Sequence, residues 1–208
     1  LITAGVDLSI GTGMICYALI GGTLVRNYNC PIVLAMLICV ALGMIIGLLN
    51  GILIGVMDLA PFLATLCTCM ITRGIGSLFS ATPWPTNGQP GGWFHSIFKL
   101  TFGSGRSALR LPIGFVFVVL LVLLMEFVLN HTKFGRYTIA IGSNKEATRL
   151  SGINVKFYHV MVYVVCGLFA GLAAIAYAAV TPTVQPGTGA GLELDAIGGV
   201  FVGGVSAT

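Results

Sequence analysis

The sequence predicts an all-α fold: a polytopic transmembrane helical bundle with broken or re-entrant helices. Of its 208 residues, 57% are hydrophobic and 8% are charged, whereas charged residues make up about 25% of a typical soluble domain. The apolar residues are gathered in runs near the ~20 residues that a helix needs to span a bilayer. So few charges could not cover this apolar surface in water, and the mild formal net charge of +4 gives no indication of a nucleic-acid partner.

Five apolar runs are the candidate spans, and they cover residues 10–25, 31–57, 59–79, 111–129 and 157–180. The run 31–57 has no charge and would be ~40 Å long as a straight helix, longer than the ~30 Å core of a bilayer. It must therefore tilt or break, and Asn50 with its neighbouring glycines marks the expected place of a break or a close helix contact. A further run, 196–205, is too short to span alone, so we expect a half-helix, a re-entrant segment or a truncated span.

Two long polar connections set the expected orientation. The connection 131–156 is basic, because one acid, Glu146, stands against Lys133, Arg136, Lys145, Arg149 and Lys156. Loops rich in lysine and arginine stay in the cytoplasm, which places this connection there. The connection 81–109 is rich in proline and glycine and would then face outward, with Trp84 and Trp93 suited to the headgroup level.

A glycine repeat marks one face of the longest run. Gly43, Gly47, Gly51 and Gly55 recur every four residues. This spacing leaves a stripe without side chains along a helix, so that the backbone of a neighbouring helix can approach closely. We interpret the stripe as helix packing, with a pore-lining role as the alternative.

Five polar side chains in or beside the apolar runs are candidates for a translocation pathway: Asp7, Ser9, Asn50, Arg73 and Asp195. Asp7 and Ser9 suit the N-cap of a helix, either at the membrane interface or on a broken helix that lines a cavity. Arg73 could extend to the interface or pair with Asp7 or Asp195 inside the membrane.

No group of residues indicates catalysis or metal binding, and we expect no catalytic residue, no metal and no cofactor in this chain. His95, His131 and His159 share no ligand spacing, and the sequence has no Gly-Lys pair and hence no phosphate-binding P-loop. Five of the six cysteines lie inside apolar runs, where cysteine serves as a small apolar filler. The chain is therefore not expected to be an enzyme.

The basic connection contains a helix signal. Ser143 or Asn144 can cap a short helix over residues 145–150, and Gly152 can end it. A short helix between two spans suits docking to a partner, whereas a plain surface loop explains the composition equally well.

Six short motifs, in one order along the whole chain, are more specific. They are Gly-Val-Asp-Leu-Ser-Ile-Gly (5–11), Gly-Arg-Tyr (135–137), Gly-Ser-Asn-Lys-Glu-Ala (142–147), Leu-Ser-Gly-Ile (150–153), Gln-Pro-Gly-Thr-Gly (185–189) and Gly-Leu-Glu-Leu-Asp-Ala-Ile (191–197). By these motifs the chain resembles the permease subunits of branched-chain-type ABC importers, especially the ribose-type sugar permeases. Gly198 and Gly199 depart from that family, which usually has alanines at these positions.

The resemblance implies a single transmembrane permease domain over residues 1–208, of the ABC importer permease type and truncated at both ends. The full-length protein would be the permease subunit of an importer that moves a ribose-like monosaccharide through the inner membrane of a bacterial cell. The implied partners are a second permease copy in a homodimer, a periplasmic or lipid-anchored sugar-binding protein, the lipid bilayer, and a cytoplasmic ATPase that binds the ATP.

The ATPase would dock on the coupling loop, residues 131–156. The implied docking residues are Gly135, Arg136, Gly142, Asn144, Glu146, Ala147, Arg149, Leu150 and Gly152. Two other interpretations stay open. An ion-coupled secondary transporter would use Asp7 and Asp195 as its membrane-embedded acids, and in a non-transporting membrane scaffold the polar residues of the apolar runs would tolerate replacement.

Overall fold

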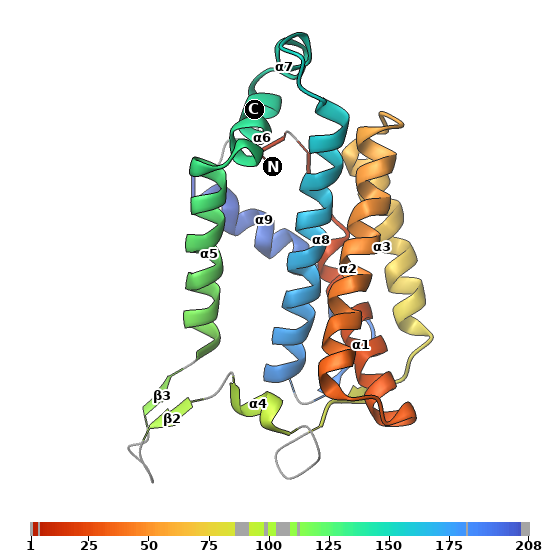
Figure 1. Cartoon of the computed structure of the whole chain (residues 1–208). Helices are drawn as coiled ribbons and strands as arrows, with labels where there is room; N and C mark the ends of the chain where they lie inside the picture. The colour runs from red at the N-terminus through yellow and green to blue at the C-terminus, as the bar shows by residue number, and fades with distance from the viewer. Residues whose placement is uncertain are drawn as a thin grey trace.

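The computed structural model describes residues 2–3, 5–85, 92–97, 100–102, 109–111, 113–181 and 183–204. Its long helices are α1 (Ile10–Tyr28), α2 (Ile32–Gly55), α3 (Pro61–Ser77), α5 (Ile113–His131) and α8 (Val155–Val180). They run roughly alongside one another, and the shorter α9 (Leu192–Val202) lies across their direction between α5 and α8 (Figure 1). The described part is therefore the helical bundle that the sequence predicts.

Small elements cover the two ends of the bundle. At one end, here called the α7 end, lie α6 (Lys133–Ser143) and α7 (Lys145–Leu150) (Figure 1). The opposite end, the α4 end, holds the short helix α4 (Trp93–Ile97) and two antiparallel strand pairs. In these pairs β1 (Thr82–Pro83) joins β4 (Thr183–Val184), and β2 (Leu100–Phe102) joins β3 (Leu109–Leu111).

Three helices of the described part are long and apolar enough to cross a membrane: α2, residues 114–131 of α5, and α8. The predicted spans 10–25 and 59–79 form α1 and α3, which lie beside α2 (Figure 1). α3 has only 17 residues, and α1 includes polar residues such as Arg26. Large apolar side chains cover the outside of the bundle, as Leu37 and Phe115 show at 62% and 68% exposed. Such a surface requires lipid around it.

The glycine stripe joins α2 to α8. A side chain on Gly43 would overlap the carbonyl oxygen of Gly167, and one on Gly47 would overlap that of Tyr163. Gly51 faces the backbone of Val160 in the same way, with its nearest atoms 2.9 Å from the Cβ that an alanine would add. α2 runs unbroken through Asn50, so of the two expectations for this position the structure has the close helix contact.

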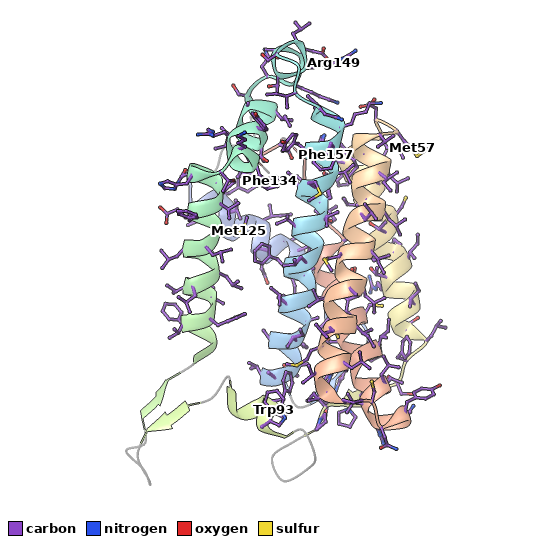
Figure 2. The ribbon with its side chains drawn as sticks, viewed as in Figure 1. Met57, Trp93, Met125, Phe134, Arg149 and Phe157 are labelled. Atoms are coloured by element: carbon purple, nitrogen blue, oxygen red, sulfur yellow. The ribbon has the colours of Figure 1, made fainter. Side chains whose placement is uncertain are left out.

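Aromatic residues fill the core near the α4 end. Trp84 is 1% exposed, and its indole N–H donates to the carbonyl oxygen of Ala18 at 3.0 Å. Its ring stacks on that of Phe94, with 5.2 Å between the centroids, and it lies over Gly21 of α1. The indole nitrogen of Trp84 is thus satisfied inside the fold and not by lipid headgroups. Trp93 is half exposed (Figure 2).

The connection 131–156 is largely helical, with a side-chain cap at the start of each helix. Thr132 Oγ accepts from the amide of Gly135, Asn144 Oδ1 accepts from Ala147, and Asn154 Oδ1 accepts from Phe157. The predicted helix over 145–150 and its cap at Asn144 are confirmed. Gly152 has φ +80°, a left-handed conformation that suits glycine after a helix. The sequence did not predict α6, which follows α5 after a single residue.

Candidate functional site

A buried polar network begins at the irregular segment 5–8 before α1. Asn50, fully buried on α2, donates from Nδ2 to the hydroxyl of Ser9 at 2.9 Å. That hydroxyl donates in turn to Asp7 Oδ1 at 2.6 Å, and the same oxygen accepts the backbone N–H of Ser9 at 2.9 Å. Three of the five predicted pathway residues are therefore one hydrogen-bonded chain. Asn50 Oδ1 has no partner among the described residues.

The threonines of α3 continue this polar surface, and the sequence analysis missed them. Thr65, Thr68 and Thr72 follow a helical spacing and are all buried on the side of α3 that faces inward. Thr65 Oγ donates to the carbonyl oxygen of Val6 at 3.2 Å. Thr72 Oγ lies 3.0 Å from Thr12 Oγ on α1. The spacing of these threonines in the sequence was the signal that could have identified them.

A cavity of about 360 Å³ lies beside the polar network. Its walls come from the N-terminal segment, α5, α6, α8 and α9, and are mostly apolar. Met125 and Phe134 line it from α5 and α6, on the sides that face α8 (Figure 2). Asp7, Tyr163 and Glu193 are among the residues that border it. The volume lies within the range of small-molecule sites, and the walls are suited to apolar rather than polar contacts.

The other two predicted pathway residues lie apart from the network. Arg73 is exposed on α3 and Asp195 is exposed on α9. Neither takes part in the two ion pairs found within the described residues. The proposed pairing of Arg73 with Asp7 or Asp195 is therefore absent from the described part of the chain.

Glu193, which the sequence analysis did not single out, brings the start of α9 against the start of α1. Its Oε1 accepts the backbone N–H of Gly191 at 3.2 Å. Its Oε2 lies where a side chain on Gly11 would be, and a Cβ on Gly189 would come within 2.5 Å of the carbonyl oxygen of Gly11. The motifs 5–11, 185–189 and 191–197 thus meet at one place. An acidic side chain beside the first turn of α1 suits the positive end of that helix.

The predicted docking residues fall into two groups. Gly135 is buried against the backbone of Leu129, and Gly142 faces the carbonyl oxygen of Ile2. These two glycines make internal contacts. The remaining predicted residues are exposed at the α7 end: Arg136, Asn144, Glu146, Ala147, Arg149, Leu150 and Gly152. Leu150, at the end of α7, is 87% exposed.

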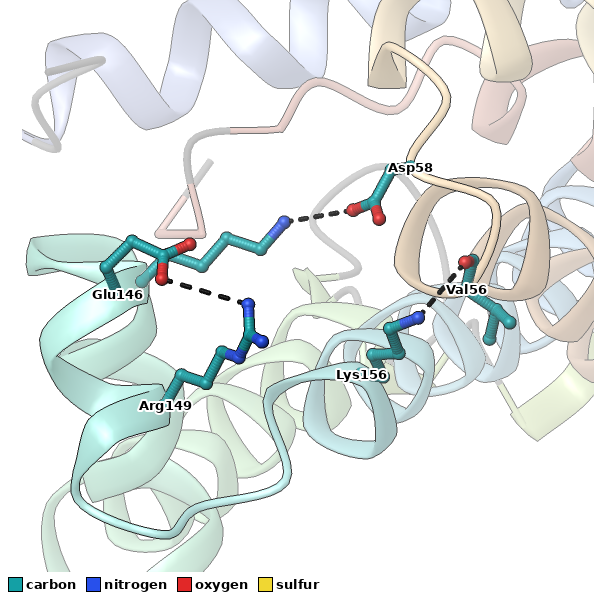
Figure 3. A network of polar contacts seen from close by, with 6 residues as sticks. Val56, Asp58, Glu146, Arg149 and Lys156 are labelled. Atoms are coloured by element: carbon teal, nitrogen blue, oxygen red, sulfur yellow. Dashed lines mark hydrogen bonds and ion pairs between the residues drawn. The ribbon is translucent and has the colours of Figure 1, made fainter.

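Two lysines of the same segment reach the turn between α2 and α3. Lys145 Nζ lies 3.2 Å from Asp58 Oδ1, and Lys156 Nζ lies 3.5 Å from the carbonyl oxygen of Val56 (Figure 3). The hydrogen bond from Lys145, and then its charge, hold the pKa of Asp58 below its usual range. Glu146 and Arg149 form an exposed pair at 3.9 Å on α7 (Figure 3).

No group of three or more His, Cys, Asp or Glu residues within the described part of the chain could hold a metal ion. The six cysteines are free thiols, and His95 bonds the carbonyl oxygen of Ala179 at 2.7 Å. The polar side chains that the sequence analysis singled out gather mainly at two places, the network at Asp7 and the α7 end.

Lipid-facing helices, a buried polar network at the irregular segment before α1, and a capped helical segment between two spans define a multi-pass membrane transport component. The chain belongs to the family described as the permease component of the branched-chain amino acid transport system, whose model matches residues 1–208. It is accordingly a protein of the inner membrane.

Similar proteins include three named sugar permeases. The ribose import permease protein RbsC of Escherichia coli is 34% identical over 99% of this chain and 63% of its own length. The fructose import permease protein FrcC of Rhizobium meliloti is 33% identical over 99% of this chain and 57% of its own length. The galactose/methyl galactoside import permease protein MglC of Escherichia coli is 34% identical over 99% of this chain and 64% of its own length. The chain thus spans less than two thirds of the length of these relatives. No solved structure matches it.

Proposed function

We propose that the full-length protein is the permease subunit of an ATP-binding-cassette importer that moves a ribose-like monosaccharide into the cytoplasm. The observation that carries this proposal is the likeness of nearly the whole chain, at 33–34% identity, to permeases named for ribose, fructose and galactose import. The three named sugars are all monosaccharides. A ribose-like monosaccharide is therefore the substrate class that these relatives support.

The α7 end is the proposed docking site of the cytoplasmic ATPase. Exposed charges and the exposed side chain of Leu150 make this end a surface that a partner protein can cover. Lys133, Arg136, Lys145, Arg149 and Lys156 lie here, which supports a cytoplasmic position by the positive-inside rule. Gly135 and Gly142 support docking indirectly, because they let α6 pack closely on its neighbours.

The proposed pathway passes the start of α1, where Asp7, Ser9 and Asn50 meet. Irregular backbone at membrane depth is tolerated where it is buried in protein or lines a cavity, and segment 5–8 borders the cavity described above. ATP would be bound and hydrolysed by the ATPase, while this subunit supplies two conformations. A second permease copy would complete the transmembrane part, and a periplasmic or lipid-anchored sugar-binding protein would deliver the sugar at the α4 end.

Co-purification of the full-length protein with its ATPase tests this proposal. The variant carries Glu146→Lys and Arg149→Glu, which exchanges the two charges of the exposed pair and so keeps an attractive i,i+3 pair within α7. Arg26→Glu is the control, because Arg26 is exposed at the other end of the bundle. We expect the wild type and the control to retain the ATPase and the double variant to release it.

Each other result has a definite meaning. Equal retention by the double variant would contradict docking at α7. If the wild type retains no ATPase, and a protonophore abolishes sugar uptake while ATP remains, the protein is an ion-coupled transporter instead.

A further inference from the structure

The turn between α2 and α3 is contacted by two lysines of the segment that we propose as the docking site. Residues 56–60 connect the two helices, and they receive Lys145 from the first position of α7 and Lys156 from the first turn of α8 (Figure 3). These contacts join parts of the chain that are 87 and 100 residues apart. The C-terminal end of α2 thus lies between two basic side chains.

The local geometry at Asp58 is unusual for a residue with a side chain. Asp58 has φ +53°, in the left-handed region where glycine is the usual residue and where Asp and Asn are the best tolerated alternatives. In this conformation its carboxylate reaches Lys145. Lys145 also occupies a position that does not favour a cation by itself, since the start of a helix is its positive end. The contact with Asp58 offsets the unfavourable position of Lys145 at the start of α7.

The turn leads into the helix that contacts the polar network. α2 is fixed to α8 by backbone contact along the glycine stripe, down to Gly55 beside Lys156 and His159. α3 follows the turn, and its threonine hydroxyls bond Val6 and Thr12. A displacement of the turn must therefore move α3 against the segment that holds Asp7 and Ser9, or strain these hydrogen bonds.

We propose that Asp58 is a positioning residue that ties α7 to the turn between α2 and α3, so that movement of α7 passes to α3 and the polar network directly as well as through α8. This inference rests on the proposed function for the identity of the partner that moves α7. The ion pair supplies a second mechanical connection at the α7 end, and its two members are 87 residues apart in the sequence. The connection is exposed, so water and salt can reach it.

The test uses the full-length importer, with its ATPase and binding protein, in liposomes supplied with labelled ribose and ATP. Asp58→Asn removes the charge while keeping a residue that tolerates positive φ, and Lys145→Gln removes the partner charge. The double variant Asp58→Asn with Lys145→Gln completes a double-mutant cycle and keeps at position 58 a residue that tolerates positive φ. Glu126→Gln is the matched control, because Glu126 is exposed on α5 and belongs to neither ion pair of the described residues.

We expect each single variant to move about two- to fivefold less ribose per ATP hydrolysed, the range that an exposed ion pair can support. The double variant should lose no more than either single variant, because the same pair is broken in all three, and the control should match the wild type. The amount of co-purified ATPase should stay constant, which separates positioning from docking. Wild-type yield in the single variants, or a double variant whose loss equals the two single losses combined, would overturn the proposal.

Hydrogen exchange of the α7 amides tests the connection without any assumption about the cargo. Asp58→Asn and Lys145→Gln should each speed the exchange of residues 147–151, whereas Glu126→Gln should leave it unchanged. Unchanged exchange in both single variants would overturn the connection itself. If the wild type moves no ribose and the exchange still responds, the substrate assigned under the proposed function is wrong and the connection stands.

Discussion

Gly47 shows how strongly a single residue is constrained in this fold. Any side chain there would overlap the carbonyl oxygen of Tyr163 on α8. Gly47→Val should therefore force the helices apart and lower stability by about 1–3 kcal/mol, as overpacking of a close-packed core does. The midpoint of thermal unfolding in detergent measures the effect. Gly74→Val is the matched control, because no atom lies within 4 Å of a Cβ at Gly74. Equal midpoints for the two variants would contradict the close contact.

Asn50 separates the stability of the network from its function. Its buried Oδ1 has no partner among the described residues, so the amide carries an unrecovered desolvation cost. Asn50→Leu should change the free energy of unfolding by no more than about 1 kcal/mol. It should lower sugar uptake, because the hydroxyl of Ser9 no longer accepts a hydrogen bond from Asn50. Ser77→Ala, which removes an exposed hydroxyl from α3, serves as the control. A large fall in the midpoint would assign Asn50 a structural role instead.

At the scale of elements, α7 is a helix of six residues whose start depends on one side chain. Asn144 Oδ1 accepts the amide of Ala147, and an N-cap of this kind contributes about 1 kcal/mol. Asn144→Ala should weaken α7 and reduce retention of the ATPase, whereas Asn144→Ser should preserve both. If Ser and Ala variants lose the ATPase equally, the carboxamide of Asn144 contacts the partner directly rather than capping the helix.

The stabilisation from the contact between α7 and the α2–α3 turn should weaken as the pH falls. Lys145 lowers the pKa of Asp58, so the charged carboxylate stabilises the folded state at pH values above the ordinary value of about 3.9. This contribution is lost as the pH falls through the lowered pKa of the folded state. Lys156 and His159 are the other titratable groups near Asp58.

Comparison of wild type and Asp58→Asn measures this dependence. The difference between their unfolding midpoints should be constant from about pH 7 to pH 5 and should narrow below about pH 4. High salt should reduce it at every pH. A difference that widens on acidification would show that the carboxylate destabilises the fold.

Elements could be predicted where the evidence for them lies in neighbouring residues, and could not where it lies in contacts between distant residues. α2, α5 and α8 were predicted because an apolar run of span length is a local property of the sequence. α6 was missed because Gly135 and Gly142 look like loop residues until their close neighbours, Leu129 and Ile2, are known. The pairing of Asp58 with Lys145 could not be predicted, since nothing local to either residue points to a partner 87 positions away. The burial of Trp84 could not be predicted for the same reason, because the carbonyl oxygen that accepts its hydrogen bond belongs to the distant residue Ala18.

For the whole molecule, the two ends of the bundle should lie on opposite sides of the membrane. The α7 end carries five of the ten basic residues, all within the connection 131–156, against one acid there, and it is expected in the cytoplasm. In a background without native cysteines, Leu150→Cys should react with a membrane-impermeant thiol reagent only in inside-out vesicles. Tyr28→Cys, at the α4 end, should react only from the outside of intact cells. Both positions are exposed, at 87% and 75%. Labelling of both from the same side would contradict this topology.

The contact between α2 and α8 also limits how the two helices can move past each other. Main chain meets main chain at intervals of four residues, so no flexible side chain is available to absorb a small slide. The next position at which glycine again faces backbone lies one repeat away, about 6 Å along the helix axis. Intermediate positions bring side chains into collision. We therefore expect α2 and α8 to keep their register under small forces and to move as one unit, so that any change of conformation during transport would occur in the helices around them.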